Sequence, residues 1–169
     1  DEGLVREIGI SNYTPERIDE WCAIAERDGL RRPVALQPHY NLVERGFESG
    51  LRDAADRHGL TVLPYFALAK GFLTGKYRDD AGVAESPRAG AARQYLDERG
   101  RRVLAELDTV AARHGVEVAT VALAWLRAQP TVGAPIASAR SVAQLAPLLA
   151  SMTLALADEE IEALTRASA

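Results

Sequence analysis

The sequence is poor in cysteine and lysine. Its 169 residues include one cysteine, Cys22, and the only lysines are Lys70 and Lys76. A single cysteine excludes a disulfide framework and a metal site built from a cysteine cluster. We therefore expect a reducing compartment, the cytoplasm. The remaining positive charges are carried by arginines.

Long apolar runs are also missing. The longest uncharged run, residues 141–157, is interrupted by serine, glutamine, proline and threonine, whereas a bilayer span needs about 20 mostly apolar residues. The first three residues, Asp-Glu-Gly, lack the apolar core of a signal peptide. We expect no membrane contact. Because the chain has no initial methionine and enters a strand almost at once, we also expect the natural protein to begin earlier.

Positive charge is not in excess. Lys and Arg number 20 and Asp and Glu 24, a formal net charge of −4, whereas nucleic acid binding needs a concentrated cationic face. Hydrophobic residues make up 47% and charged residues 26%, which excludes a disordered or fibrous chain. A chain of this length can bury one compact core, so we expect a single domain over residues 1–169.

Short apolar segments alternate with segments of helical periodicity. This alternation is typical of parallel βαβ units and predicts an α/β fold with four parallel strands and flanking helices. Residues 66–94 are rich in small residues and are expected to form a long loop. Strands are expected at 5–10, 33–37, 61–65 and 131–136, and helices at 15–28, 48–58, 96–114, 118–128, from 141 onward and at 158–166.

Phosphate-loop and metal-binding motifs do not fit this chain. The GFLTGK run at 71–76 has three residues between its glycines, and Tyr77 follows Lys76, whereas a P-loop has four residues and then a hydroxyl for Mg²⁺. The sequence has no Gly-x-Gly-x-x-Gly turn. The histidines stand on separate elements, and the two Arg-His-Gly sequences at 57–59 and 113–115 are typical of helix C-termini.

Polar side chains follow each expected strand at the point where it ends. In parallel α/β folds, ligands bind at the carboxyl ends of the strands. Amide side chains there can hold a carboxamide, a tyrosine ring can stack on a flat heterocycle, and cations can hold phosphates. The residues concerned, strand by strand, are Ser11 and Asn12, then Gln37, then Tyr65, and finally Ser138 and Arg140.

The same residues also have structural interpretations. Asn12 and Thr14 suit the cap of the helix that follows them. Ser141 and Gln144 match a capping box, in which Gln144 bonds back to the N–H of Ser141. Tyr65 can belong to the core. Taken singly, the residues leave both interpretations open, whereas their convergence on one face favours a ligand site.

Five motifs resemble, in the same order, those of the aldo-keto reductase family. They are IGISNY at 8–13, LQPHYN at 36–41, PY with GFLTGKY within 64–77, ALAWL at 122–126 and PIASARS at 135–141. The family forms a (β/α)8 TIM barrel that transfers hydride from NADPH to carbonyl compounds, and a full barrel runs to about 250 residues. The resemblance implies that this chain is a half barrel, strands five to eight.

The resemblance also implies that the chain binds NADP, with NAD as a possibility. The chain departs from the family at Ala137-Ser138, where Pro-Gly or Pro-Lys is common, and at Leu148, where Asn is common; Arg140 is expected to hold the 2′-phosphate instead. The implied contacts are Ser11, Asn12, Gln37 and Tyr65 with the nicotinamide, Leu68, Lys70, Gly71, Leu73, Gly75 and Lys76 along the pyrophosphate, and Ala137, Ser138, Ala139, Arg140 and Gln144 around the adenosine phosphate.

The family's catalytic Asp, Tyr, Lys and His come from the first half of the barrel, so the resemblance implies no catalytic residue here. Tyr40 or Tyr65 with Lys70 is a poor substitute, because nothing in the sequence indicates a tyrosine poised as an acid. The intact protein is expected to reduce small aldehydes or ketones, and this chain alone to be inactive. Two alternatives remain, a non-catalytic dinucleotide-binding or regulatory module and a half barrel that self-associates through its open strand edges.

Overall fold

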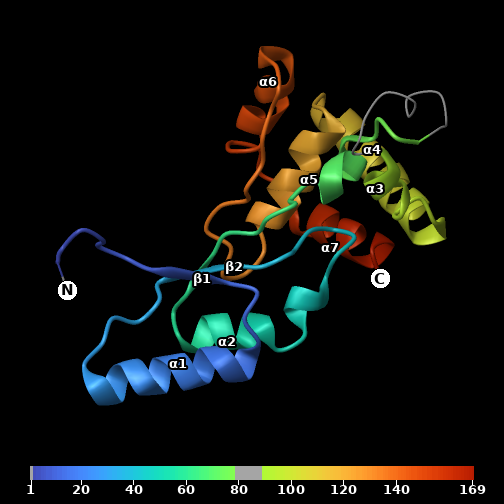
Figure 1. Ribbon diagram of the computed structural model, residues 1–169. Helices are drawn as coiled ribbons and strands as arrows, with labels where there is room; N and C mark the ends of the chain where they lie inside the picture. Colours follow the sequence, from blue (N-terminus) through green and yellow to red (C-terminus); the bar gives the residue numbers. More distant parts are fainter. Residues whose placement is uncertain (1, 79–88) are drawn as a thin grey trace.

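Helices flank a small parallel sheet (Figure 1). The structure is a computed structural model and describes residues 2–78 and 89–169. The strands pair in the order β1-β2-β3, all parallel, in agreement with the βαβ units predicted from the sequence. Their bounds are Gly9–Ser11 for β1, Ala35–Gln37 for β2 and Thr61–Val62 for β3.

One residue from each strand contributes to a central layer of the core. Ile10 lies opposite Leu36, and Leu36 lies opposite Val62, in the parallel ladders. All three side chains are buried. Side chains alternate across a strand, so the next residues, Ser11 and Gln37, leave this layer and are exposed at the carboxyl ends of β1 and β2.

The fourth strand predicted at 131–136 is not formed as a regular strand. This segment meets β3 through one parallel bridge, Val62 with Val132, and the Val62 N–H donates to the Thr131 carbonyl oxygen over 2.9 Å. Thr131 has a φ of 68°, outside the strand region, and Pro135 has no N–H to donate. The described sheet therefore has three strands, with an irregular fourth segment beside β3.

Helix α1 (Pro15–Asp28) begins and ends where the sequence predicts. The Thr14 hydroxyl accepts from the Arg17 N–H over 3.3 Å, and Gly29 closes the helix with a left-handed φ of 65°. Asn12 takes no part in this cap; its side chain bonds elsewhere. The buried residues of α1 are Ile18, Cys22 and Ala25, which recur at helical spacing.

The helix predicted at 48–58 is divided in two. The 3-10 helix η1 (Gly46–Glu48) comes first, and α2 (Leu51–Arg57) follows after Gly50. Gly50 has a φ of 84°, which interrupts the helix. Helix α2 packs beside α1 on the same side of the sheet (Figure 1).

The remaining helices form a second group. Helix α4 (Glu98–His114) packs against both α5 (Val118–Arg127) and α7 (Asp158–Ala167), and α5 is buried along most of its length. Helix α6 (Val142–Ala150) contacts α5 but buries none of its own residues, and it projects from the top of the molecule in Figure 1. The helical stripe predicted for α4 is buried: Val103, Leu104, Leu107, Val110 and Ala111.

The stretch at 66–94, expected to be one long loop, contains regular structure near both ends. The 3-10 helix η2 (Ala69–Thr74) buries Phe72 and Leu73, and the short helix α3 (Ala89–Arg93) packs on it. Burial of these apolar side chains favours compact turns over an open loop. The middle of the stretch, 79–88, lies outside the described residues.

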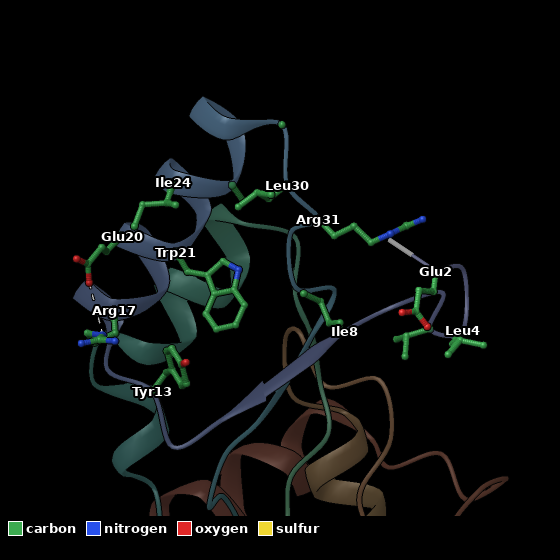
Figure 2. A pocket seen from close by; sticks show the side chains of 13 residues that line it. Glu2, Leu4, Ile8, Tyr13, Arg17, Glu20, Trp21, Ile24, Leu30 and Arg31 are labelled. Carbon is green, nitrogen blue, oxygen red and sulfur yellow. Dashed lines mark ion pairs between the residues drawn. The ribbon is translucent and has the colours of Figure 1, made fainter.

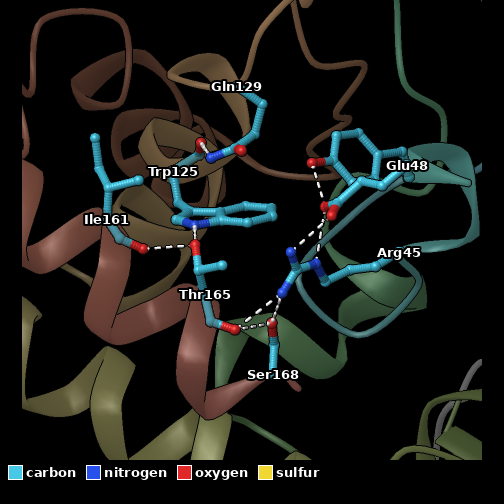
Figure 3. Close-up of polar contacts among 8 residues, drawn as sticks. Arg45, Glu48, Trp125, Gln129, Ile161, Thr165 and Ser168 are labelled. Atoms are coloured by element: carbon cyan, nitrogen blue, oxygen red, sulfur yellow. Dashed lines mark hydrogen bonds and ion pairs between the residues drawn. The ribbon is translucent and has the colours of Figure 1, made fainter. Parts of the chain in front are cut away.

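A polar network joins α7 to the segment after β2 (Figure 3). The Arg45 guanidinium makes a bidentate ion pair with Glu48 and also donates to the Thr165 carbonyl oxygen and the Ser168 hydroxyl, each over 2.9 Å. The Trp125 indole N–H donates to the Thr165 hydroxyl over 3.0 Å. These bonds satisfy polar groups in a half-buried place and so hold α7 in position.

The two Arg-His-Gly sequences have similar structural roles. The Nε2 atom of His58 lies 2.6 Å from an oxygen of Asp19 on α1, and that of His114 lies 2.9 Å from an oxygen of Glu160 on α7. Each histidine therefore links the end of one helix to an acidic side chain on another.

Gly100 should be intolerant of any side chain. A Cβ at this position would lie 1.8 Å from the Tyr95 carbonyl oxygen and 2.9 Å from the Phe72 ring, both of which are held by packing. We expect Gly100→Ala to lower the free energy of unfolding by about 3 kcal/mol or more, measured by urea denaturation.

Gly90 in α3 provides the matched control, because a Cβ there meets nothing within 4 Å. Gly90→Ala should leave stability unchanged or raise it by up to about 1 kcal/mol. Equal unfolding midpoints for Gly100→Ala and the wild type would contradict the close approach at Gly100.

Glu160 should contribute stability that depends on pH. Hydrogen bonds from His114 and from the Ala157 backbone N–H lower the pKa of Glu160, so its contribution is present above its ordinary pKa and is lost as the pH falls through the folded value. We expect Glu160→Gln to cost about 1–2 kcal/mol at pH 7 and progressively less below about pH 4. Urea denaturation at both pH values checks this; the exposed Glu162→Gln should cost less than about 0.5 kcal/mol.

Candidate functional site

A cavity of about 720 Å³ lies beyond the carboxyl end of β3. Its wall is built from the segment after β3, the start of α5 and the segment that leads into α6. The volume falls within the range of small-molecule and cofactor sites, about 300–1,000 Å³. Among its lining residues are Tyr65, Phe66, Lys70, Gly71, Lys76, Glu117, Ser138, Arg140 and Gln144.

Tyr65 is held in the cavity wall by contacts with residues that follow β1 and β2. Its hydroxyl donates to the Asn12 side-chain oxygen over 3.0 Å, and its backbone forms a parallel bridge with His39. Its ring stacks on the His39 imidazole, with centroids 5.2 Å apart and planes 15° from parallel. Tyr65 is thus a wall residue of the cavity rather than part of the core.

The backbone after Tyr65 is strained. Phe66, Ala69 and Lys70 have φ values of 51°, 48° and 58°, which side chains other than glycine rarely adopt. Asn41 anchors this segment, because its fully buried amide donates to the Phe66 carbonyl oxygen over 2.9 Å and its oxygen accepts from the backbone N–H of Val43. Strain of this kind persists only where the surroundings compensate for it, and it is concentrated at functional sites.

Gly71 lines the cavity at a tight turn of the chain. It has a φ of 100°, and a Cβ there would lie 3.2 Å from the Tyr77 ring and 3.5 Å from the Lys76 side chain. Glycine therefore lets the chain turn tightly and expose backbone to a ligand.

The cavity wall carries a net positive charge. Three cations line it, Lys70, Lys76 and Arg140, against one acid, Glu117. The Lys70 ammonium lies 5.5 Å from the centre of the Phe66 ring. Cations gathered around a partly enclosed volume favour an anionic ligand.

The start of α6 differs in one detail from the predicted capping box. Ser141 caps the helix, its hydroxyl accepting from the Gln144 N–H over 3.3 Å. The Gln144 side-chain oxygen, however, accepts from the Arg140 N–H over 3.0 Å, not from the N–H of Ser141. This bond fixes the backbone of Arg140 at the rim of the cavity.

Most of the predicted site residues meet at this cavity. Ser11, Asn12 and Gln37 do not line it. Asn12 is joined to its wall by the hydrogen bond from Tyr65, and the Ser11 hydroxyl donates to the Gln37 carbonyl oxygen over 2.8 Å. Those that line it are Tyr65, Leu68, Lys70, Gly71, Lys76, Ala137, Ser138, Arg140 and Gln144; those that do not are Leu73, buried in the core, Gly75, at the end of η2, and Ala139.

The site predicted from the sequence omits Phe66, Glu117 and His39, which lie at or behind the cavity. Phe66 directly follows Tyr65, a predicted site residue, and this adjacency is the signal that could have indicated it. Glu117 stands at the start of a buried helix and is brought to the cavity only by the packing of α5. His39 belongs to the motif at 36–41, but that motif does not indicate its position behind Tyr65.

A second hollow, of about 1,090 Å³, lies between α1 and the segment before β1 (Figure 2). Its wall includes Trp21 and Ile8, and Leu4 and Leu30 are strongly exposed beside it. None of the predicted site residues lines it, and its charged groups include the Arg17–Glu20 ion pair. An apolar surface of this kind, next to the edge strand β1, suits contact with protein rather than with a nucleotide.

Over residues 2–78 and 89–169, no group of three or more His, Cys, Asp or Glu side chains could hold a metal ion. In the same ranges no helix has the length and apolar character needed to cross a bilayer.

Comparison with known proteins identifies the family. A model of the aldo/keto reductase family matches residues 1–169. The chain belongs to the aldo/keto reductase family. Membership accounts for the parallel α/β arrangement, since the family fold is a (β/α)8 barrel and the described sheet forms part of one.

Individual relatives show the same similarity. Protein tas of Escherichia coli K12 is 34% identical over 166 residues, covering 95% of this chain and 48% of tas. L-glyceraldehyde 3-phosphate reductase of the same strain is 30% identical over 153 residues, 85% of this chain and 43% of the relative. A probable voltage-gated potassium channel subunit beta of rice is 32% identical over 152 residues, covering 86% of this chain and 46% of the relative. The chain thus spans about half the length of these relatives.

Loss of the Asn41 amide should destabilise the cavity wall. Asn41→Ala leaves the Phe66 carbonyl oxygen and the Val43 N–H without these partners in a buried place. We expect a loss of about 2–4 kcal/mol in the free energy of unfolding, measured by urea denaturation. Ser11→Ala, which removes one exposed hydrogen bond, should cost less than about 1 kcal/mol. Similar losses for the two variants would contradict the anchoring role.

Proposed function

We propose that this chain binds NADP, with NAD as the weaker ligand, and forms the cofactor-binding half of a reductase of aldehydes or ketones. The observation that carries the proposal is the cavity beyond β3, where an aromatic ring, a glycine turn and three cations line one volume. Membership in the aldo/keto reductase family supports this reading of the cavity.

The residues present fit such a cofactor. Tyr65 offers a flat ring to the nicotinamide, and the polar groups of Ser11, Asn12 and Gln37 lie near it at the strand ends. Gly71 lines the cavity at a turn with a φ of 100°, where the pyrophosphate can approach the backbone. Lys70 and Lys76 supply charge to the phosphates.

The adenosine end is assigned to the segment that leads into α6. Ser138, Arg140 and Gln144 line this part of the cavity, and the Gln144 side chain fixes the Arg140 backbone. Arginine forms bidentate hydrogen bonds with phosphate, so Arg140 is the proposed partner of the 2′-phosphate. Leu148 and Pro147 offer an apolar surface to the adenine.

The cofactor, when bound, supplies the hydride for carbonyl reduction, and the side chains of this chain bind and orient it. Neither tyrosine considered from the sequence is suited to act as the proton donor. Tyr40 is buried and donates to Glu48, and both burial and that carboxylate raise its pKa far above the ordinary value. The Tyr65 hydroxyl already donates to Asn12. We propose that the proton donor belongs to the other half of the barrel.

Cofactor binding can be tested by titrating the chain with NADP⁺ and NAD⁺ in a calorimeter. We expect Arg140→Ala to weaken NADP⁺ at least tenfold, the effect of one charge-assisted hydrogen bond, and to leave NAD⁺ within about threefold. Lys70→Ala should weaken both. Equal affinity of the wild type for the two dinucleotides would overturn the role of Arg140.

Arg166→Ala is the matched control, because Arg166 is exposed and pairs only with Glu162 among the described contacts of its side chain. It should leave both affinities unchanged. Failure of the wild-type chain to bind either dinucleotide would overturn the proposed function.

A non-catalytic dinucleotide-binding module is the second candidate. It is favoured by the similarity to a probable potassium channel subunit beta, a name that describes no reduction. Joining this chain to the N-terminal half of Protein tas separates the two candidates. Oxidation of NADPH by an aldehyde supports the reductase; tight binding with no turnover supports the module.

Self-association of the chain remains a proposal as well. It is supported by the apolar hollow beside β1, where Leu4 is 84% and Leu30 59% exposed. Sedimentation of the isolated chain at several concentrations tests it, and a single monomer species would overturn it.

A further inference from the structure

His39 lies directly behind the tyrosine of the cavity wall. The two rings are stacked, with centroids 5.2 Å apart and planes 15° from parallel, and a parallel bridge joins the two residues along the backbone. Tyr65 lines the cavity and His39 does not. The imidazole therefore supports the ring from the side away from the ligand volume.

A second ring completes the support. Phe66 meets the edge of the imidazole at 5.4 Å and the edge of the Tyr65 ring at 5.3 Å, both at about right angles, 72° and 73°. The Asn41 amide holds the Phe66 backbone. The Tyr65 ring is thus restrained by His39, by Phe66 and by the hydrogen bond of its hydroxyl to Asn12.

The surroundings of the His39 imidazole favour its neutral form. Its Nε2 atom is buried and has no hydrogen-bond partner. Burial lowers the pKa of His39, Lys70 lowers it further, and Glu44 opposes the shift. Protonation would put a second N–H into a place without an acceptor, so it costs free energy that the neutral ring avoids.

We propose that His39 is a positioning residue, which holds the Tyr65 ring by stacking so that it is ready to receive the nicotinamide. This inference rests on the proposed function of the cavity. A ring that is fixed before binding loses less conformational entropy when the ligand binds. More of the free energy of stacking therefore contributes to affinity. The contribution belongs to the nicotinamide end, because the ring contacts of His39 are with Tyr65 and Phe66.

The test compares NADP⁺ with 2′-phospho-ADP-ribose, which lacks the nicotinamide ring. Calorimetric titration of the full chain gives both dissociation constants. His39→Ala should weaken NADP⁺ by about three- to tenfold, the range for one aromatic pair, and leave 2′-phospho-ADP-ribose within about twofold. A general loss of structure would weaken both ligands equally and would overturn the proposal.

His39→Phe is the second variant, because it keeps a flat ring at this position and does not titrate. It should bind NADP⁺ within about threefold of the wild type at pH 7.5. A loss of NADP⁺ affinity as large as that of His39→Ala would show that a flat ring at this position is not what positions Tyr65, and would overturn the proposal.

The outcomes separate this inference from the proposed function. If the wild type binds neither ligand, the cavity is not a dinucleotide site and the proposed function fails. If the wild type binds both and His39→Ala matches it for both, the site stands and the role of His39 fails. Urea denaturation of each variant confirms that it is folded before titration.

Discussion

The parallel register of the sheet is the constraint on which the candidate site depends. Because Ile10, Leu36 and Val62 lie opposite one another, the residues that follow them along each strand emerge at the same edge. Ser11 can therefore reach the Gln37 carbonyl oxygen, and Asn12 can reach Tyr65 across 53 positions of sequence. A shift of the strand register by one residue would point these polar side chains into the core.

A buried hydrogen bond then stabilises the strained backbone conformation after Tyr65. The left-handed residues after Tyr65 cost free energy, and the fully buried Asn41 amide compensates by donating to the Phe66 carbonyl oxygen. The result is a wall that carries two aromatic rings and two lysines at a glycine turn. Local strain and a fixed anchor together give the cavity a preformed wall.

The cavity and the hollow differ in chemistry. The cavity beyond β3 combines cations with aromatic rings, which suits a phosphate-bearing heterocycle. The hollow beside β1 is lined by apolar side chains from the segment before β1, from α1 and from Leu30, with charged groups among them. The hollow has the larger volume, so volume does not identify the candidate ligand site. The cavity is favoured by its cations, its glycine turn and its place at the strand ends.

Local signals in the sequence determined the ends of α1 and the class of fold. Thr14, Pro15 and Gly29 act within a turn of themselves, so α1 needed no tertiary information, and the stripe on α4 follows from helical spacing alone. Tertiary structure decided the rest: the irregular segment beside β3, the Gln144 bond to Arg140, the burial of Leu73, and the meeting of His39 with Tyr65. Each of these depends on contacts or backbone angles that no short pattern of residue types encodes, because packing between distant segments chooses among locally similar conformations.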